Sequence, residues 1–203
     1  MPTSLPSAIT IDGMTLTVTV ERKQVKNVNA RLKDGRLAIS APLRMPAATL
    51  DPIISELARK LIRRAHAQQV NREEDALALA QQVARRFPVP PAVGDVTFVT
   101  TQQARWGSYS TATRTIRLHA ALRDMPRWVL EAVMAHELAH AIHPDHSPAF
   151  WALTRRVYPA TDRAQAFLSG VSWLGRRWEQ LPAVSRMLLT GVAACGDEQE
   201  DAG

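Results

Sequence analysis

Two histidines separated by three residues constrain this chain more than any other feature of its sequence. The run His-Glu-Leu-Ala-His occupies residues 136–140, inside a segment whose apolar residues recur at helical spacing. On a helix, residues four apart share one face with side chains roughly 5–6 Å apart, so His136 and His140 can bind one zinc ion. Glu137 flanks that ion without ligating it, and it can take a proton from a water that zinc makes more acidic. The run therefore predicts a zinc hydrolase.

Two further histidines, His143 and His146, compete for the third ligand position. A catalytic zinc site uses three protein ligands and keeps a fourth position open. On a continued helix His143 would lie about 10.5 Å along the axis from His136, which suits a shared tetrahedral ion poorly. Pro144 also disfavours helical geometry at His143, so the chain can reverse and bring His146 toward the ion. We predict His146 as the third ligand, and for His143 a place beside the ligands, in contact with substrate, or on the surface.

The composition indicates a globular protein with no membrane partner. At 203 residues, with 46% apolar and 22% charged residues, the chain can hold one full core and a small appended lobe. It has no run of 18 apolar residues, no signal peptide pattern at the N-terminus, and a single cysteine, Cys195, that cannot form an internal disulfide. We expect a cytoplasmic location.

The net charge of +6 hides an uneven distribution. Residues 196–203 carry four acids and no base, which leaves 25 basic and 15 acidic residues in the rest of the chain. Arginine pairs recur at residues 63–64, 85–86, 155–156 and 176–177. A basic body is compatible with nucleic acid or with an acidic partner, but solvated helix faces explain such pairs as well. Nucleic acid is therefore a candidate partner beside the peptide or protein substrate that a hydrolase of this kind would take.

Periodicity and proline content divide the chain into parts. Strands are predicted within residues 14–40, with a turn at 33–36, and helices are predicted over 47–68 and 71–87. Further strands are predicted at 95–100 and 114–119, and the proline cluster at 87–91 is the predicted boundary between two domains. The predicted parts are an N-terminal extension (1–13), a β-rich and helical lobe (14–90), a catalytic domain (91–195) and an acidic disordered tail (196–203).

The strands at 95–100 and 114–119 directly precede the helix that carries the histidines. One of them could edge the cleft and take an extended peptide by adding it to the sheet, although an ordinary hairpin with a packing tryptophan explains this region equally well. After His146, Ser147 and Pro148 predict the start of a helix whose packing face includes Phe150 and Trp151. A further helix is predicted from Thr161 to about residue 170.

Several short runs together resemble a known family. They are Arg-Trp-Gly-Ser at 105–108, Thr-Ile-Arg-Leu at 115–118, His-Glu-Leu-Ala-His at 136–140, and His-Pro-Asp-His-Ser at 143–147 followed by Phe-Trp at 150–151. This combination resembles the YgjP-like metallopeptidases, which are zinc-dependent and have the SprT-like and WLM peptidases as apparent relatives. The resemblance implies a zincin-like α+β fold with a small N-terminal β-sheet lobe. It also implies one zinc ion per chain, held by His136, His140 and His146, with Glu137 as the base.

One position departs from that family. The family commonly has cysteine after Arg-Trp-Gly-Ser, whereas this chain has Tyr109. A thiol-dependent role is therefore absent, and the tyrosine hydroxyl could help to stabilise an oxyanion, although a packed aromatic ring is the favoured interpretation. Arg105, Tyr109 and His143 are candidates for contacts beside the metal or with substrate.

The SprT-like relatives suggest, by analogy alone, an alternative function. In it the chain is a nucleic-acid-associated module whose proteolysis is linked to DNA or whose zinc only stabilises the fold. The presence of Glu137 argues against a purely structural zinc, because such a site needs no base.

Overall fold

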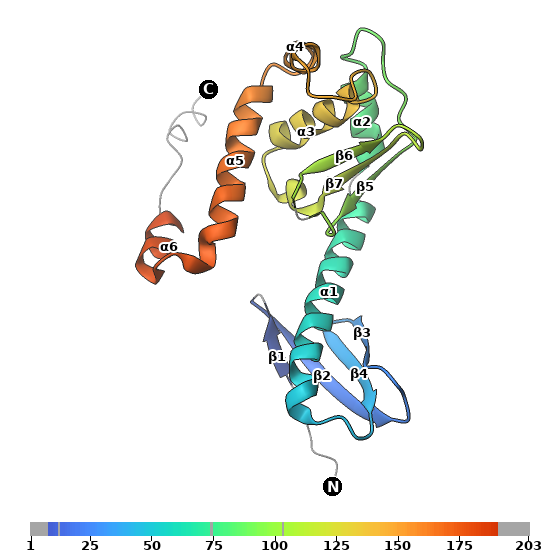
Figure 1. Cartoon of the computed structure of the whole chain (residues 1–203), viewed down its shortest axis with the longest axis vertical. Helices are drawn as coiled ribbons and strands as arrows, with labels where there is room; N and C mark the ends of the chain where they lie inside the picture. The colour runs from blue at the N-terminus through green and yellow to red at the C-terminus, as the bar shows by residue number, and fades with distance from the viewer. Residues whose placement is uncertain (1–7, 12, 74, 103, 191–203) are drawn as a thin grey trace, which may run out of the picture.

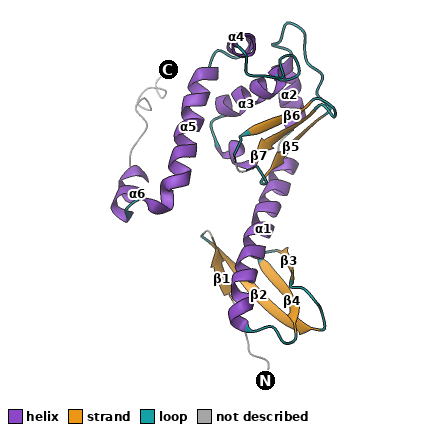
Figure 2. Cartoon of the chain, in the orientation of Figure 1, coloured by secondary structure: helices purple, strands orange, loops and turns teal. Residues whose placement is uncertain are grey.

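The chain forms two lobes joined by one long helix (Figure 1). The computed structural model describes residues 8–190 except 12, 74 and 103, so the predicted acidic tail lies outside the described residues. Both lobes combine helices with strands (Figure 2), which confirms the predicted α+β class.

The N-terminal lobe is a four-stranded sheet with the order β1-β2-β4-β3. Its strands are β1 (Ala8–Ile11), β2 (Met14–Lys23), β3 (Asn29–Lys33) and β4 (Arg36–Pro42). The central pair β2 and β4 is parallel, and the two outer pairs are antiparallel. Asp34 and Gly35 both have positive φ, as a two-residue hairpin turn requires, so the predicted turn is confirmed. Strand β1 was not predicted, and it lies within the segment that the sequence assigned to an N-terminal extension.

Helix α1 (Ala47–Glu73) belongs to both lobes. Near its start Leu50, Ile54 and Ala58 recur every four residues and are buried against the N-terminal sheet, as a core-facing helix stripe should be. Near its end Val70 is buried in a second, separate core. The change from one core to the other therefore occurs inside α1, and the predicted domain boundary near residue 90 stays a prediction.

The second lobe contains a three-stranded sheet with the order β5-β7-β6. Its strands are β5 (Asp95–Val99), β6 (Gly107–Ser110) and β7 (Thr115–His119). Strands β5 and β7 are parallel, and β6 pairs antiparallel with β7. The sequence predicted β5 and β7 but not β6.

One edge of this sheet is closed and the other is not. The side-chain amide of Asn71, on α1, donates to the carbonyl of Phe98 and accepts from its N–H, both at 2.8 Å. Asn71 thus takes the place of a neighbouring strand beside β5. The cavity described below is lined by β6 and by no described residue of β5 or β7, the two strands that the sequence analysis proposed for that place.

Helices α2 (Ala76–Ala84) and α3 (Arg127–Ala139) pack on the second sheet. The chain continues through α4 (Pro148–Val157), α5 (Thr161–Arg177) and α6 (Ala183–Thr190), with short 3-10 turns at Ala120–Asp124 and Trp178–Gln180. Ser147 caps α4 as predicted, since its hydroxyl accepts from the N–H of Phe150 at 3.4 Å. The sequence predicted that the helix from Thr161 ends near Gly170, but α5 continues to Arg177. None of the residues of α6 is buried. No helix in the described part of the chain is long and apolar enough to cross a membrane.

Candidate active site

Three histidines converge at the carboxyl end of α3. His136 lies in the last turn of the helix, His140 follows as its C-cap, and His146 returns from the turn before α4. One ring nitrogen from each lies within 4.8 Å of the other two, and the Nε2 atoms of His136 and His146 are 3.0 Å apart. Zinc–nitrogen bonds of 2.0–2.1 Å in a tetrahedron place neighbouring ligands roughly 3.3 Å apart, so this donor set fits a zinc ion.

The protonation of these histidines suits metal binding. Burial, together with the smaller effect of the nearby His140 and His146, lowers the pKa of His136 to about 4. Burial also lowers the pKa of His140. Both rings are therefore neutral near pH 7 and offer the lone pair that a metal ligand needs.

His143 contributes a backbone atom to this cluster. Helix α3 ends at Ala139, and in the turn that follows the N–H of His143 donates to the carbonyl of Ala139 at 2.9 Å. The Nδ1 atom of His140 lies 3.2 Å from the carbonyl oxygen of His143. A carbonyl can only accept, so Nδ1 carries the hydrogen and leaves Nε2 free for a metal. The imidazole of His143 is not part of the described cluster.

An aromatic wall supports the three imidazoles. Phe150 is fully buried, and its ring centre lies 4.7–4.8 Å from the centres of all three histidine rings. Trp151 stacks on His146 at 5.6 Å between ring centres. The prediction that Phe150 packs in the core is confirmed, whereas no pattern in the sequence indicates its contact with the three histidines.

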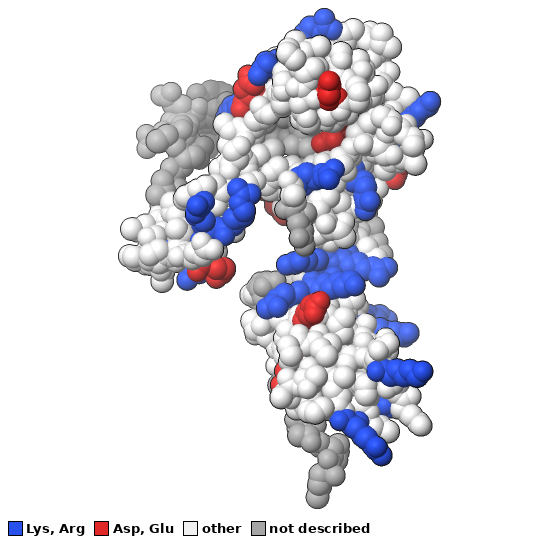
Figure 3. All heavy atoms as spheres, in the orientation of Figure 1, with Lys and Arg blue, Asp and Glu red and all other residues white. Residues whose placement is uncertain are grey.

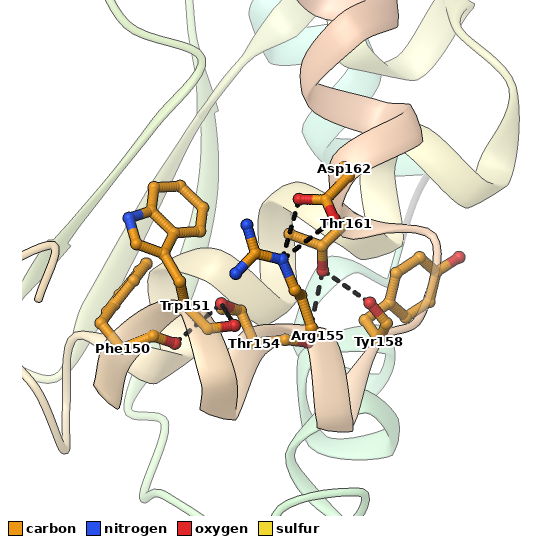
Figure 4. A network of polar contacts seen from close by, with 7 residues as sticks. All are labelled: Phe150, Trp151, Thr154, Arg155, Tyr158, Thr161 and Asp162. Atoms are coloured by element: carbon orange, nitrogen blue, oxygen red, sulfur yellow. Dashed lines mark hydrogen bonds and ion pairs between the residues drawn. The ribbon is translucent and has the colours of Figure 1, made fainter. Parts of the chain in front are cut away.

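A polar network fixes α4, which carries this wall, to α5 (Figure 4). The hydroxyl of Thr161 donates to the carbonyl of Tyr158 at 2.6 Å and to that of Thr154 at 3.3 Å, and both threonines are buried. On the surface, Nε of Arg155 contacts both carboxylate oxygens of Asp162 at 2.9 and 3.0 Å. The corner between the two helices is therefore held from inside and outside.

Glu137 is buried beside the cluster, with 5% of its surface exposed. Burial raises the pKa of its carboxyl to about 7, and the charge of Arg105 acts in the opposite direction. A carboxyl group with such a pKa can both accept and release a proton near neutral pH.

Strand β6 approaches Glu137 very closely, and it can do so because residue 107 is glycine. A Cβ at Gly107 would collide with Oε1 of Glu137 and would lie 2.8 Å from both Cγ and Cδ. The Arg-Trp-Gly-Ser run therefore has a geometric requirement at its third position. The sequence alone could not reveal this requirement, because it links residues thirty positions apart.

A cavity of about 750 Å³ lies in front of these residues, which is within the usual range for ligand sites. One wall is β6 with Arg105 and Tyr109, and the other is α5 with Leu168 and Ser172. The indole N–H of Trp106 donates to the hydroxyl of Ser172 at 3.1 Å and ties the two walls together. The position of α5 beside this cavity was not predicted, because no pattern in the sequence of α5 links it to the histidines.

The other two candidate residues, Arg105 and Tyr109, both line this cavity. Arg105 is exposed, whereas Tyr109 is half-buried and packs against the second core. Their roles beside the metal or with substrate stay predictions.

Comparison with known proteins identifies one family. The family model described as YgjP-like, metallopeptidase domain, matches residues 73–170, which run from the end of α1 into α5. No curated protein and no solved structure has significant similarity to the chain. The matched segment contains the three histidines, Glu137 and β6.

We predict that Gly107→Ala destabilises the second lobe through its collision with Glu137. The free energy of unfolding should fall by about 1–3 kcal/mol, as in other overpacked interiors. In a Glu137→Ala background the same change should cost less than about 0.5 kcal/mol, because the colliding atoms are gone. Urea unfolding followed by tryptophan fluorescence measures this, since all five tryptophans lie beyond residue 105.

Gly170→Ala is the matched control for this cycle. A Cβ at Gly170 meets no atom within 4 Å, so this helical change should be neutral or stabilising by up to about 1 kcal/mol. An equal cost of Gly107→Ala in both backgrounds would contradict the proposed collision.

A second prediction tests which of His146 and His143 is the third zinc ligand. His146→Ala should lower the zinc content below one ion per chain, because one of three converging nitrogens is lost. His143→Ala should leave the zinc content unchanged, because the contribution of His143 is its backbone carbonyl. Metal analysis after dialysis measures both, and the opposite pattern would overturn this assignment.

Proposed function

Residues 73–170 of this chain belong to the YgjP-like family as its metallopeptidase domain, and on that basis we propose that the chain is a zinc-dependent peptidase. In this proposal His136, His140 and His146 hold one zinc ion, and Glu137 is the general base. The observation that carries it is the convergence of three histidine nitrogens next to a buried carboxyl at one end of a large cavity. A zinc ion bound there would supply Lewis acidity, which polarises a carbonyl and acidifies water.

Strand β6 would position the substrate. It is the edge strand that lines the cavity, so its backbone can pair with an extended peptide in the manner of an added strand. Gly107 lies on this strand directly against Glu137, so a peptide paired there would place one of its peptide bonds close to the base.

Glu137 would move the proton during the reaction. Its carboxylate would accept a proton from the attacking water and pass it to the nitrogen of the leaving amine. Its pKa, raised to about 7, would allow the carboxyl group both to accept the proton from water and to release it to the amine. Arg105, whose charge reaches Glu137, would favour the ionised form that starts the cycle.

We predict that Glu137→Gln removes activity and keeps the metal. The amide has almost the same shape but cannot act as a base, so the rate of peptide cleavage should fall by about 10²–10⁴-fold. Zinc content should stay at the wild-type value, because the three histidines are unchanged. Glu56→Gln, an exposed change on α1, is the control. Cleavage by Glu137→Gln at the wild-type rate would show that Glu137 is not the base.

Association with nucleic acid is the second candidate function, and one feature of the surface favours it. Lys and Arg side chains gather over the part of α1 between the two lobes (Figure 3). They include Arg59, Lys60, Arg63 and Arg64, which are exposed and form no ion pair with any acid that the structure describes.

This candidate makes a prediction about salt. If these four residues contact phosphates, the affinity for double-stranded DNA should fall steeply with salt. Replacing all four with glutamine should then reduce the slope of log K against log salt by about 3.6, or 0.9 per contact. Fluorescence anisotropy across a salt series measures this slope. Binding that is undetectable for the wild-type chain at about 50 mM salt would exclude the candidate.

A further inference from the structure

A second cavity adjoins the first. It has a volume of about 580 Å³ and shares Tyr109 and Thr111 with the cavity in front of the histidines. Its other walls are the proline-rich segment 88–91, the turn that follows α3, and part of α4. The shared residues make it a continuation of the cleft beyond Tyr109.

The spacing of strand and helix shows where this cavity lies relative to the base. Tyr109 lies two strand residues, or about 6.6 Å, from Gly107, the residue that touches Glu137. From Glu137 to Ala141 is four residues of helix and helical turn, or about 6 Å. Tyr109 and Ala141 both line the second cavity, so β6 and the end of α3 leave the base in the same direction. A peptide paired with β6 would therefore reach this cavity two to four residues from the cleaved bond.

The walls of the second cavity combine apolar surface with positive charge. Val89 and Ile142 line it with 74% and 43% of their surface exposed, so both offer apolar surface to a ligand. Arg114 and Arg156 line it as well, and both are exposed. No acidic residue is among the described residues that line it, and neither arginine forms an ion pair with a described acid.

These walls are held in place by the backbone. Three of the four residues at 88–91 are prolines, whose rings fix φ and stiffen the segment. Just after this segment, the N–H of Gly94 donates to the carbonyl of Arg114 at 2.9 Å, which connects the chain before β5 to the turn before β7. Arg114 itself has φ of 54°, a conformation that few residues other than glycine adopt. A fixed wall lowers the entropy cost of binding.

We propose that this second cavity is a substrate subsite that selects an apolar side chain accompanied by a carboxylate, two to four residues from the cleaved bond. The inference rests on the proposed peptidase function. Val89 and Ile142 would contact the apolar side chain, and Arg114 and Arg156 would bind the carboxylate. The carboxylate comes either from an aspartate or glutamate side chain or from the free C-terminus of the peptide.

Profiling of the zinc-loaded full chain with a randomised decapeptide library tests the subsite. Wild-type cleavage should be enriched for Leu, Ile or Val together with Asp or Glu at two to four residues from the cleaved bond, on one side of that bond. Peptides that differ only in Glu against Gln at that place, and peptides with free against amidated C-termini, then distinguish the two sources of the carboxylate. We expect kcat/KM to be about tenfold higher for whichever form carries the preferred carboxylate.

The variant Arg114→Asn with Arg156→Gln should abolish this tenfold preference and leave kcat/KM for the neutral peptides within about twofold. Asparagine is chosen at 114 because it tolerates positive φ. The control is Arg31→Gln with Arg36→Gln, which removes two exposed charges from the N-terminal sheet and should keep the preference. Ile142→Asp, which places a carboxylate in the subsite, should reverse the preference, so that the neutral peptides are cleaved with the higher kcat/KM.

The outcomes separate the two proposals. If the wild-type chain cleaves no peptide of the library, the peptidase function fails and the subsite fails with it. If peptides are cleaved without the acidic and apolar preference, or the double arginine variant retains it, only the subsite is overturned.

Discussion

The close approach of β6 to α3 at Gly107 is the contact on which the geometry of the second lobe depends. Leu118 of β7 is directly opposite Gly107 in the sheet and is fully buried, so the glycine lies over the core and not at its margin. With no Cβ between them, strand and helix can enclose the carboxyl of Glu137 while leaving it on the cavity wall. A larger residue would separate the edge strand from Glu137, and under the proposed function the strand could then no longer align a substrate with that carboxyl.

The two edges of the sheet in this lobe differ in how they are covered. An unpaired edge exposes backbone donors and acceptors that invite association, and proteins usually cover it. Here the edge at β5 is closed by the side-chain amide of Asn71, which lies near the end of α1. Helix α1 thus does more than connect two cores, because its Asn71 pairs with β5 at Phe98 and β6 remains as the other edge of this sheet.

Local features of the site could be predicted from the sequence, and features that depend on long-range pairing could not. The spacing of His136 and His140, the break at Pro144 and the cap at Ser147 act over a few residues, so the sequence contains their physical causes. Strand β6 is only four residues long, Gly-Ser-Tyr-Ser, and holds a single large side chain, so it shows no alternation of apolar and polar residues that would predict a strand. The wall formed by α5 depends on a contact between Trp106 and Ser172, sixty-six residues apart, which periodicity cannot indicate.

The proposed metal would also link function to stability in this lobe. Two half-buried imidazoles, those of His136 and His140, and the buried carboxyl of Glu137 are costly to place together, because polar groups lose hydration there. Phe150 adds to that cost, since its ring packs 4.7–4.8 Å from the centres of all three histidine rings and Trp151 stacks on His146, so apolar surface covers part of each imidazole. A cation that binds these nitrogens only in the folded lobe would offset the cost by mass action. The residues that would carry out the chemistry would then be the same residues through which zinc stabilises the fold, and the N-terminal lobe, whose core is separate, would gain nothing directly from the ion.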